Sequence, residues 1–124
     1  MVKAVVYIEH SSTVCKSLKF IRDVRVKCTQ GSKIEALKKY GIPDDDYHFA
    51  KSFIHDCLRL NPKECIAVIK DDRIEKLIKG LINEIPELKY RVTVTITHKF
   101  CMNNDEMIEF AKRILTKYLV AEKR

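Results

Sequence analysis

The sequence is poor in the residues that mark several functional classes. It has three glycines, three prolines and no tryptophan among 124 residues. Gly31, Gly41 and Gly80 are far apart, which excludes a glycine-rich phosphate-binding loop. No apolar run approaches the about 18 residues of a membrane span, and the first residues lack the apolar core and cleavage site of a signal peptide. We therefore expect a cytoplasmic protein without a membrane partner.

The five cysteines include no Cys-x-x-Cys pair. Their spacing fits neither a zinc site nor the disulfide framework of a secreted protein. Because their neighbours are mostly apolar, we expect buried free thiols. One structural disulfide is the alternative, since intracellular proteins of hyperthermophiles use disulfides, and the single glutamine and abundant lysine and isoleucine favour an archaeal or thermophilic source. The cysteines are Cys15, Cys28, Cys57, Cys65 and Cys101.

Composition and charge indicate one globular domain with an anionic partner. A hydrophobic content of 46% supports one core, so residues 1–124 are expected to form a single domain. The chain has 24 Lys and Arg against 17 Asp and Glu, a formal charge of +7. Eight of the cations and only two acids lie between Thr13 and Tyr40, a net charge of +6. Such a basic stretch suits the phosphate backbone of RNA, although a solvated surface is the plainer interpretation.

Hydrophobic patterning predicts an α/β domain. Four strands are expected, two of them continuously apolar and two alternating, at Val2–Ile8, Asp23–Cys28, Glu64–Ile69 and Arg91–His98. Amphipathic helices separate them, with capping residues near Ser11, Ser32, Asp44, Asp72 and Asn103. Strands that alternate with helices build mainly parallel sheets. The expected architecture is therefore a three-layer sandwich around a sheet of about four strands.

Acidic residues follow the two apolar strands. Glu9 comes directly after the first strand, Asp71 and Asp72 come after the third, and Asp46 opens a helix. The carboxyl ends of parallel strands share one edge of a sheet, so these carboxylates could form a cluster. Carboxylate oxygens are the ligands that Mg²⁺ or Mn²⁺ prefers, and such ions activate water and clamp a scissile phosphate. Taken singly, each acid is more simply a helix N-cap.

Three segments have an acidic residue where a strand ends or a helix begins. The first is the strand and turn Val5-Val6-Tyr7-Ile8-Glu9-His10-Ser11-Ser12. The second is residues 40–50, with Gly41 and Pro43 before Asp44-Asp45-Asp46, and the third is residues 66–77, where a strand runs into Asp71. From about Val5 to Leu77, the chain thus resembles the PIN-like domain superfamily, compact VapC-like ribonucleases included. In that family the first strand ends in Asp-Thr-Ser, a Gly and a small residue or Pro precede a helix-opening Asp, and a later strand closes on Thr-x-Asp.

The resemblance implies a metal-dependent ribonuclease that acts on single-stranded RNA, often the toxin of a toxin–antitoxin pair. Glu9, Asp46 and Asp71 would be the catalytic residues, and the same three with Asp72 would hold Mg²⁺ or Mn²⁺. Glu9 stands where the family has Asp, and Ile69 where Thr is common. A catalytically degenerate PIN-like module that binds nucleic acid or protein is therefore the alternative. A Toprim-like domain ranks next, although Asp71 and Asp72 are adjacent rather than spaced by one residue.

Four cations are expected to contact RNA phosphates. They are Lys16, Lys19, Lys70 and Arg73, which lie near the two acidic strand ends in the sequence. His48 and His55 share one face of a predicted helix but are too far apart to chelate a metal. The last helix has a broad apolar face, which predicts a homodimer, and an antitoxin or another protein is a further expected partner.

Overall fold

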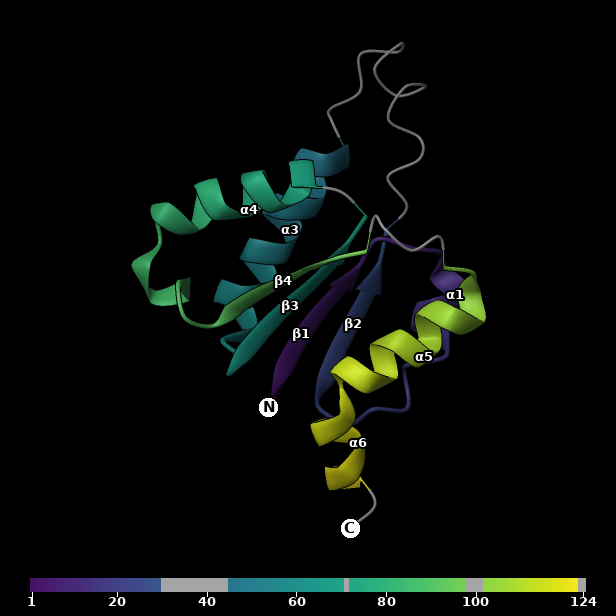
Figure 1. Cartoon of the computed structure of the whole chain (residues 1–124). Helices are drawn as coiled ribbons and strands as arrows, with labels where there is room; N and C mark the ends of the chain where they lie inside the picture. The colour runs from purple at the N-terminus through teal and green to yellow at the C-terminus, as the bar shows by residue number, and fades with distance from the viewer. Residues whose placement is uncertain (30–44, 71, 98–101, 123–124) are drawn as a thin grey trace.

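The structure is a computed structural model that describes residues 1–29, 45–70, 72–97 and 102–122. Its four parallel strands form one sheet in the order β2-β1-β3-β4 (Figure 1). The strands are β1 (Ala4–Ile8), β2 (Val24–Cys28), β3 (Glu64–Ile69) and β4 (Val92–Ile96). The predicted α/β class and parallel sheet are confirmed, and the two strands predicted to alternate lie at the two edges. The strand order reverses between β1 and β3.

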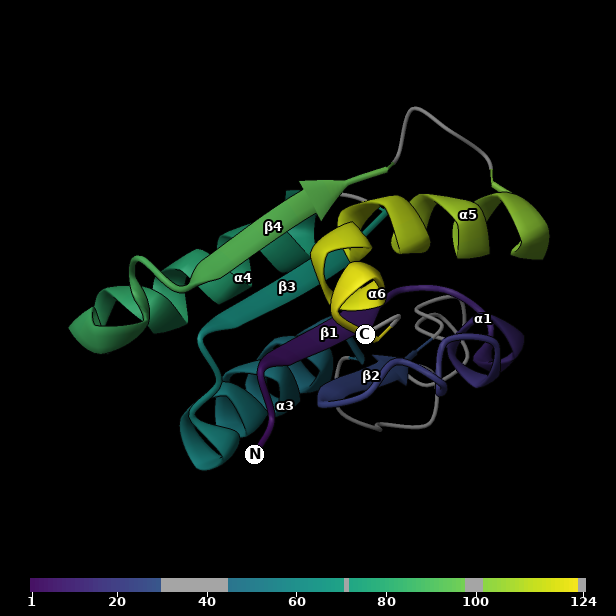
Figure 2. The same cartoon turned by 90° about the horizontal axis from the view of Figure 1, so that it is seen from below.

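Helices cover both faces of the sheet, which gives three layers (Figures 1 and 2). The bounds are α1 (Ser12–Lys16), α3 (Asp45–Leu60), α4 (Asp72–Asn83), α5 (Asn104–Ile114), α6 (Thr116–Glu122) and a 3₁₀ helix η2 (Pro86–Leu88). The expected last helix is thus divided into α5 and α6, and the helix expected after Ser32 lies outside the described residues. Within the described ranges, none of the helices combines the length and apolar character that a bilayer span requires.

Strand alternation decides which side chains meet which helices. In β1, Val5 and Tyr7 pack into the cluster with α3 and α4, whereas Val6 and Ile8 pack with α1 and α5. The same alternation divides edge strand β2, whose Val24, Val26 and Cys28 pack on the α1 and α5 side. Arg25 and Lys27 therefore stand on the opposite face, beside α3. Among the strands, α3 packs mainly on β1 and β3, so it leaves this face of β2 accessible.

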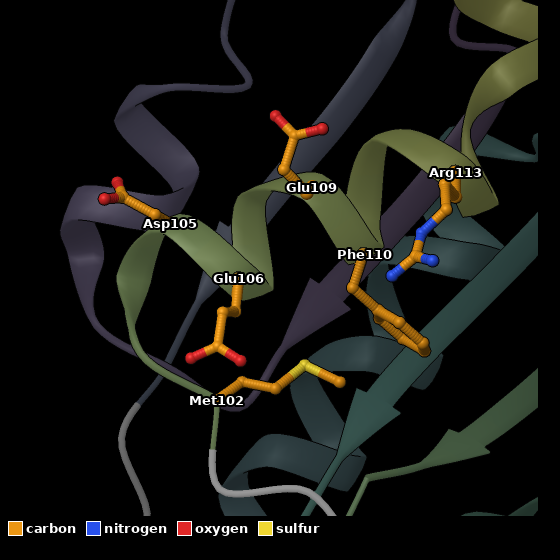
Figure 3. A pocket seen from close by; sticks show the side chains of 6 residues that line it. All are labelled: Met102, Asp105, Glu106, Glu109, Phe110 and Arg113. Atoms are coloured by element: carbon orange, nitrogen blue, oxygen red, sulfur yellow. The ribbon is translucent and has the colours of Figure 1, made fainter.

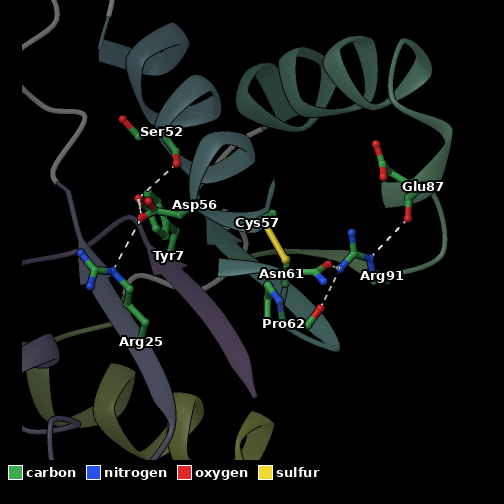
Figure 4. The surroundings of a disulfide bond; sticks show 10 residues. Tyr7, Arg25, Ser52, Asp56, Cys57, Asn61, Pro62, Glu87 and Arg91 are labelled. Atoms are coloured by element: carbon green, nitrogen blue, oxygen red, sulfur yellow. Dashed lines mark hydrogen bonds and ion pairs between the residues drawn. A yellow bond between two sulfur atoms is a disulfide. The ribbon is translucent and has the colours of Figure 1, made fainter. Parts of the chain in front are cut away.

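The structure pairs four of the five cysteines. Cys15 bonds to Cys28 and Cys57 to Cys65, with Cα–Cα distances of 5.8 and 6.2 Å that suit a disulfide. The second bond ties the last turn of α3 to the start of β3 (Figure 4). The expectation of buried free thiols is therefore wrong for these residues, because the partners meet only through helix–strand packing. Cys101 lies outside the described residues.

The sheet covers the apolar face of the C-terminal helices. Met107, Ala111 and Leu115 are buried, and Ile108 and Ile114 pack against the same cluster. The broad apolar face on which the expected homodimer rested is thus used within the chain. Large exposed apolar side chains in the described residues belong to separate segments: Met1, Phe20, Tyr47, Leu58 and Tyr90. The homodimer stays a prediction, but the apolar face of the last helices no longer supports it, because this face packs on the sheet.

Candidate functional site

The carboxyl ends of β1 and β3 meet at one edge of the sheet. The two strands are parallel neighbours with Ile8 opposite Val68, so the residues that follow them emerge side by side. Glu9 is only 6% exposed there, and its Oε1 accepts a hydrogen bond from the backbone N–H of Lys70 at 2.6 Å. Open α/β sheets bind ligands where the strand order reverses, which is this edge.

The structure describes the side chains of only two of the four predicted metal ligands, Glu9 and Asp72. Glu9 lies at the carboxyl edge, and Asp72 begins α4 with a side chain that is 60% exposed and pairs with Lys76 at 3.7 Å. Asp46 belongs to the first turn of α3, but its side chain lies outside the described part, and so does Asp71. The described residues contain no group of three potential ligands. Glu9 and Asp72 do not make a metal site alone, so a complete one needs Asp46 and Asp71.

The four predicted phosphate contacts fall into two groups. Lys70 follows β3 and Arg73 lies in the first turn of α4, so both belong to the carboxyl edge. Lys16 lies in α1 and Lys19 follows that helix, and both are exposed on the layer of α1 and α5. The described part of the basic stretch is thus divided, because Arg25 and Lys27 stand on the opposite face of β2. A stretch that is continuous in sequence does not form one surface.

A basic groove lies between β2 and α3, and we call it the β2–α3 groove. Its volume is about 440 Å³. Its described lining residues are Tyr7, Arg25, Lys27, His48, Lys51, Ser52, His55 and Asp56. The strand residues are neighbours in register, with Tyr7 opposite Lys27, and the helical residues recur every three or four positions along one face of α3. Sequence reasoning missed Lys51, although its spacing from His48 and His55 places it on their face.

Asp56 forms the buried floor of the groove and is 7% exposed. The Tyr7 hydroxyl donates a hydrogen bond to Asp56 Oδ2 at 2.5 Å, and Arg59 Nη2 donates to Oδ1 at 3.2 Å. Arg25 Nε lies 3.8 Å from Oδ2 (Figure 4). Burial by itself raises the pKa of Asp56, but the hydrogen bonds from Tyr7 and Arg59 and the charges of Arg25 and Arg59 outweigh it, so the pKa is lowered.

Asp56 is paired with Tyr7, Arg25 and Arg59, so two other cations of the groove, Lys27 and Lys51, can contact an external anion. Burial, followed by the hydrogen bond and charge of Asp56, raises the pKa of Tyr7, so its hydroxyl remains a donor. Lys27 Nζ lies 5.6 Å from the centre of the Tyr7 ring and Lys51 Nζ lies 5.4 Å from that of Tyr47. Neither lysine forms an ion pair within the described residues. Asp56, the one carboxylate of the described lining, is already satisfied by protein donors.

A second cavity, along α5, has the opposite charge. Its volume is about 650 Å³, and Figure 3 shows the six side chains that line it. Glu106 and Phe110 lie on the same side of the helix as Met102, and the guanidinium of Arg113 lies 5.8 Å from the Phe110 ring centre. Asp105, Glu106 and Glu109 make its lining acidic. Three carboxylates against the single described cation, Arg113, make this lining unfavourable for phosphate groups.

No family model matches the chain, and neither a curated protein nor a solved structure matches it. The resemblance to PIN-like domains therefore stays a prediction, and the candidate sites rest on their own geometry.

The contacts of Asp56 predict a pH-dependent contribution to stability. At pH 7 the variant D56N should lower the free energy of unfolding by about 1.5–3 kcal/mol, since hydrogen bonds to a charged group contribute about that much. A carboxyl whose pKa is lowered by folding stabilises the protein above its unfolded pKa, and this stabilisation is lost as the pH falls through the folded pKa. Urea unfolding should therefore show the difference between parent and D56N shrinking from about pH 5 to about pH 2.

Glu64 provides the matched control, because its pKa is also lowered. Burial alone would raise that pKa, but hydrogen bonds from Lys117 and Tyr118 and the charge of Lys117 outweigh burial. The variant E64Q should keep the part of the pH dependence that belongs to Asp56. A D56N difference that is the same at both ends of the pH range would contradict the assignment.

Proposed function

We propose that this protein binds single-stranded RNA, whose backbone lies in the β2–α3 groove. The observation that carries the proposal is the convergence of Arg25 and Lys27 from β2 with Lys51 from α3 on one open groove. Binding that neutralises phosphates gains free energy from released counterions, and lysines without a carboxylate partner can do so at little cost. Arg25 is more restricted, because it faces Asp56.

An exposed aromatic side chain supports a single strand rather than a duplex. Tyr47 is 42% exposed and lies one helical turn from Lys51, whose ammonium approaches its ring. Bases of a single strand are free to stack on such a ring, whereas bases in a duplex are already stacked. His48 and His55 line the same groove and add donors for phosphate oxygens.

We propose metal-dependent cleavage as a second candidate function, of the PIN-like type. The observation that favours it is the position of Glu9, a buried carboxylate at the edge where the strand order reverses. Asp46 and Asp71 would complete a site for Mg²⁺ or Mn²⁺, which would supply activated water, and Asp72 would border it. Lys70 and Arg73 stand at that edge to hold phosphate. Without a metal, the same chain would be a degenerate module that binds RNA, or an antitoxin or other protein.

The groove predicts how RNA affinity depends on particular lysines. The double variant K27A/K51A should weaken binding to an unstructured oligonucleotide by at least about tenfold, as expected when two phosphate contacts are lost. The slope of log K against log salt should become less negative by about 1.4, since each contact to a single strand contributes about 0.7. Fluorescence anisotropy at several salt concentrations measures both quantities.

The matched control is K16A/K19A, which removes the same charge from the layer of α1 and α5. This variant should bind RNA nearly as the parent does. If K16A/K19A weakens binding as much as K27A/K51A, the groove is not the RNA site.

The metal hypothesis predicts that Mn²⁺ stabilises the folded chain. An ion at about 100 times its Kd adds about 2.7 kcal/mol to stability, so thermal unfolding should shift upward. E9Q and D71N should abolish the shift, while D105N, which removes an acid from α5, should keep it. RNA cleavage should require Mg²⁺ or Mn²⁺ and disappear in D46N. If the protein binds RNA but shows neither stabilisation by Mn²⁺ nor metal-dependent cleavage, the metal hypothesis is wrong and the protein is a degenerate RNA-binding module.

A further inference from the structure

The amino ends of the strands border a third cavity, which we call the amino-edge cavity. It lies at the opposite edge from Glu9 and has a volume of about 600 Å³. The residues that line it come from β3, β4, α6 and the segments that precede β1, β3 and β4, and Figure 2 views the molecule from this side. They are Met1, Lys3, Lys63, Glu64, Tyr90, Arg91, Thr93, Lys117 and Tyr118. The four cations are far apart in sequence, so only the fold brings them together.

Arg91 is held in place by neutral oxygens. Its Nη1 donates to Asn61 Oδ1 and to the Pro62 carbonyl, both at 2.8 Å, and its Nε donates to the Glu87 carbonyl at 3.3 Å (Figure 4). None of these acceptors is a carboxylate, so they orient the guanidinium without neutralising its charge. Arginine that is oriented in this way is suited to phosphate recognition.

The carboxylate of this cavity is already occupied. Glu64 Oε1 accepts a hydrogen bond from the Tyr118 hydroxyl and lies 2.6 Å from Lys117 Nζ. Lys117 is therefore balanced by Glu64, and Lys3 lies 3.9 Å from Asp23. Lys63 is exposed and has no ion pair within the described residues. Lys63 and Arg91 are thus the two cations of the lining whose charge no described carboxylate balances.

Tyr90 gives the cavity an aromatic surface. Its side chain is 91% exposed, and it directly precedes Arg91 in the chain. Lys89 Nζ lies 5.8 Å from its ring centre. The ring is not packed into the core, so a contribution to the core does not explain an aromatic residue at this position. A planar base could stack on the ring while a phosphate reaches the neighbouring cations.

We propose that the amino-edge cavity binds a nucleotide, with its phosphate at Arg91 and Lys63 and its base on Tyr90. The nucleotide is either free or the terminal residue of an RNA chain, because both present the same base and phosphate. The amino-edge cavity shares no lining residue with the β2–α3 groove. Nucleotide binding at this cavity therefore does not depend on RNA binding in the groove.

Calorimetric titration of the full chain at low salt tests the proposal with adenosine 5′-monophosphate, adenosine and inorganic phosphate. The monophosphate should bind at least about tenfold more tightly than adenosine or phosphate, because it alone offers both groups. Y90A should reduce its affinity to that of phosphate, and K63A should weaken it by about tenfold. Both residues are exposed, so neither variant removes a core contact.

F20A and K76A are the controls, since they remove an exposed aromatic ring and an exposed lysine elsewhere. They should bind the monophosphate as the parent does, and so should K27A/K51A, which separates this site from the RNA groove. Tighter binding of a 5′-phosphorylated trinucleotide than of the monophosphate would identify an RNA end as the source, and equal binding a free nucleotide. Equal affinities for all three small probes, or parental affinity in both Y90A and K63A, would overturn the proposal.

Discussion

The carboxylate of Asp56 is the constraint on which the arrangement of α3 depends. A buried charge is costly unless donors surround it, and removal of one partner leaves the other unsatisfied. Asp56 meets this requirement with Tyr7 from β1, Arg25 from β2 and Arg59 from its own helix. Because Tyr7 and Arg25 belong to two different strands, their contacts with Asp56 tie α3 to the sheet. The Tyr7 ring then packs edge-on against Phe49 and Phe53, so polar and apolar contacts fix the same geometry.

This constraint has a consequence for the surface. With α3 fixed over β1, the outward residues of edge strand β2 border a groove instead of a packed interface. The chain's charges are then separated by face: cations line the β2–α3 groove and the amino-edge cavity, while acids line the cavity along α5. The described part of a protein with a net charge of +7 thus has cavities whose linings differ in the sign of their charge.

Much of the fold could be predicted from local patterns. The apolar run Glu64–Ile69 is a central strand with the predicted bounds, and the alternation of Asp23–Cys28 correctly indicated an edge strand. The site was harder, because it depends on which face each residue occupies. Alternation sends Arg25 and Lys27 away from Lys16 and Lys19, so one basic stretch becomes two surfaces. Asp56 did leave a signal: it is an acid between Phe53 and Cys57 on the apolar face of a helix, where a buried charge needs a partner.

The most direct test of the central claim is to map RNA contacts on the labelled protein by NMR. An unstructured oligonucleotide titrated at low salt should shift the backbone amides of Arg25, Lys27, Lys51 and Ser52, which border the β2–α3 groove. The amides of Glu106 to Arg113 along α5 should stay unchanged, because that surface is acidic. Shifts confined to Lys16, Lys19 and α5, with none in β2 or α3, would contradict the account.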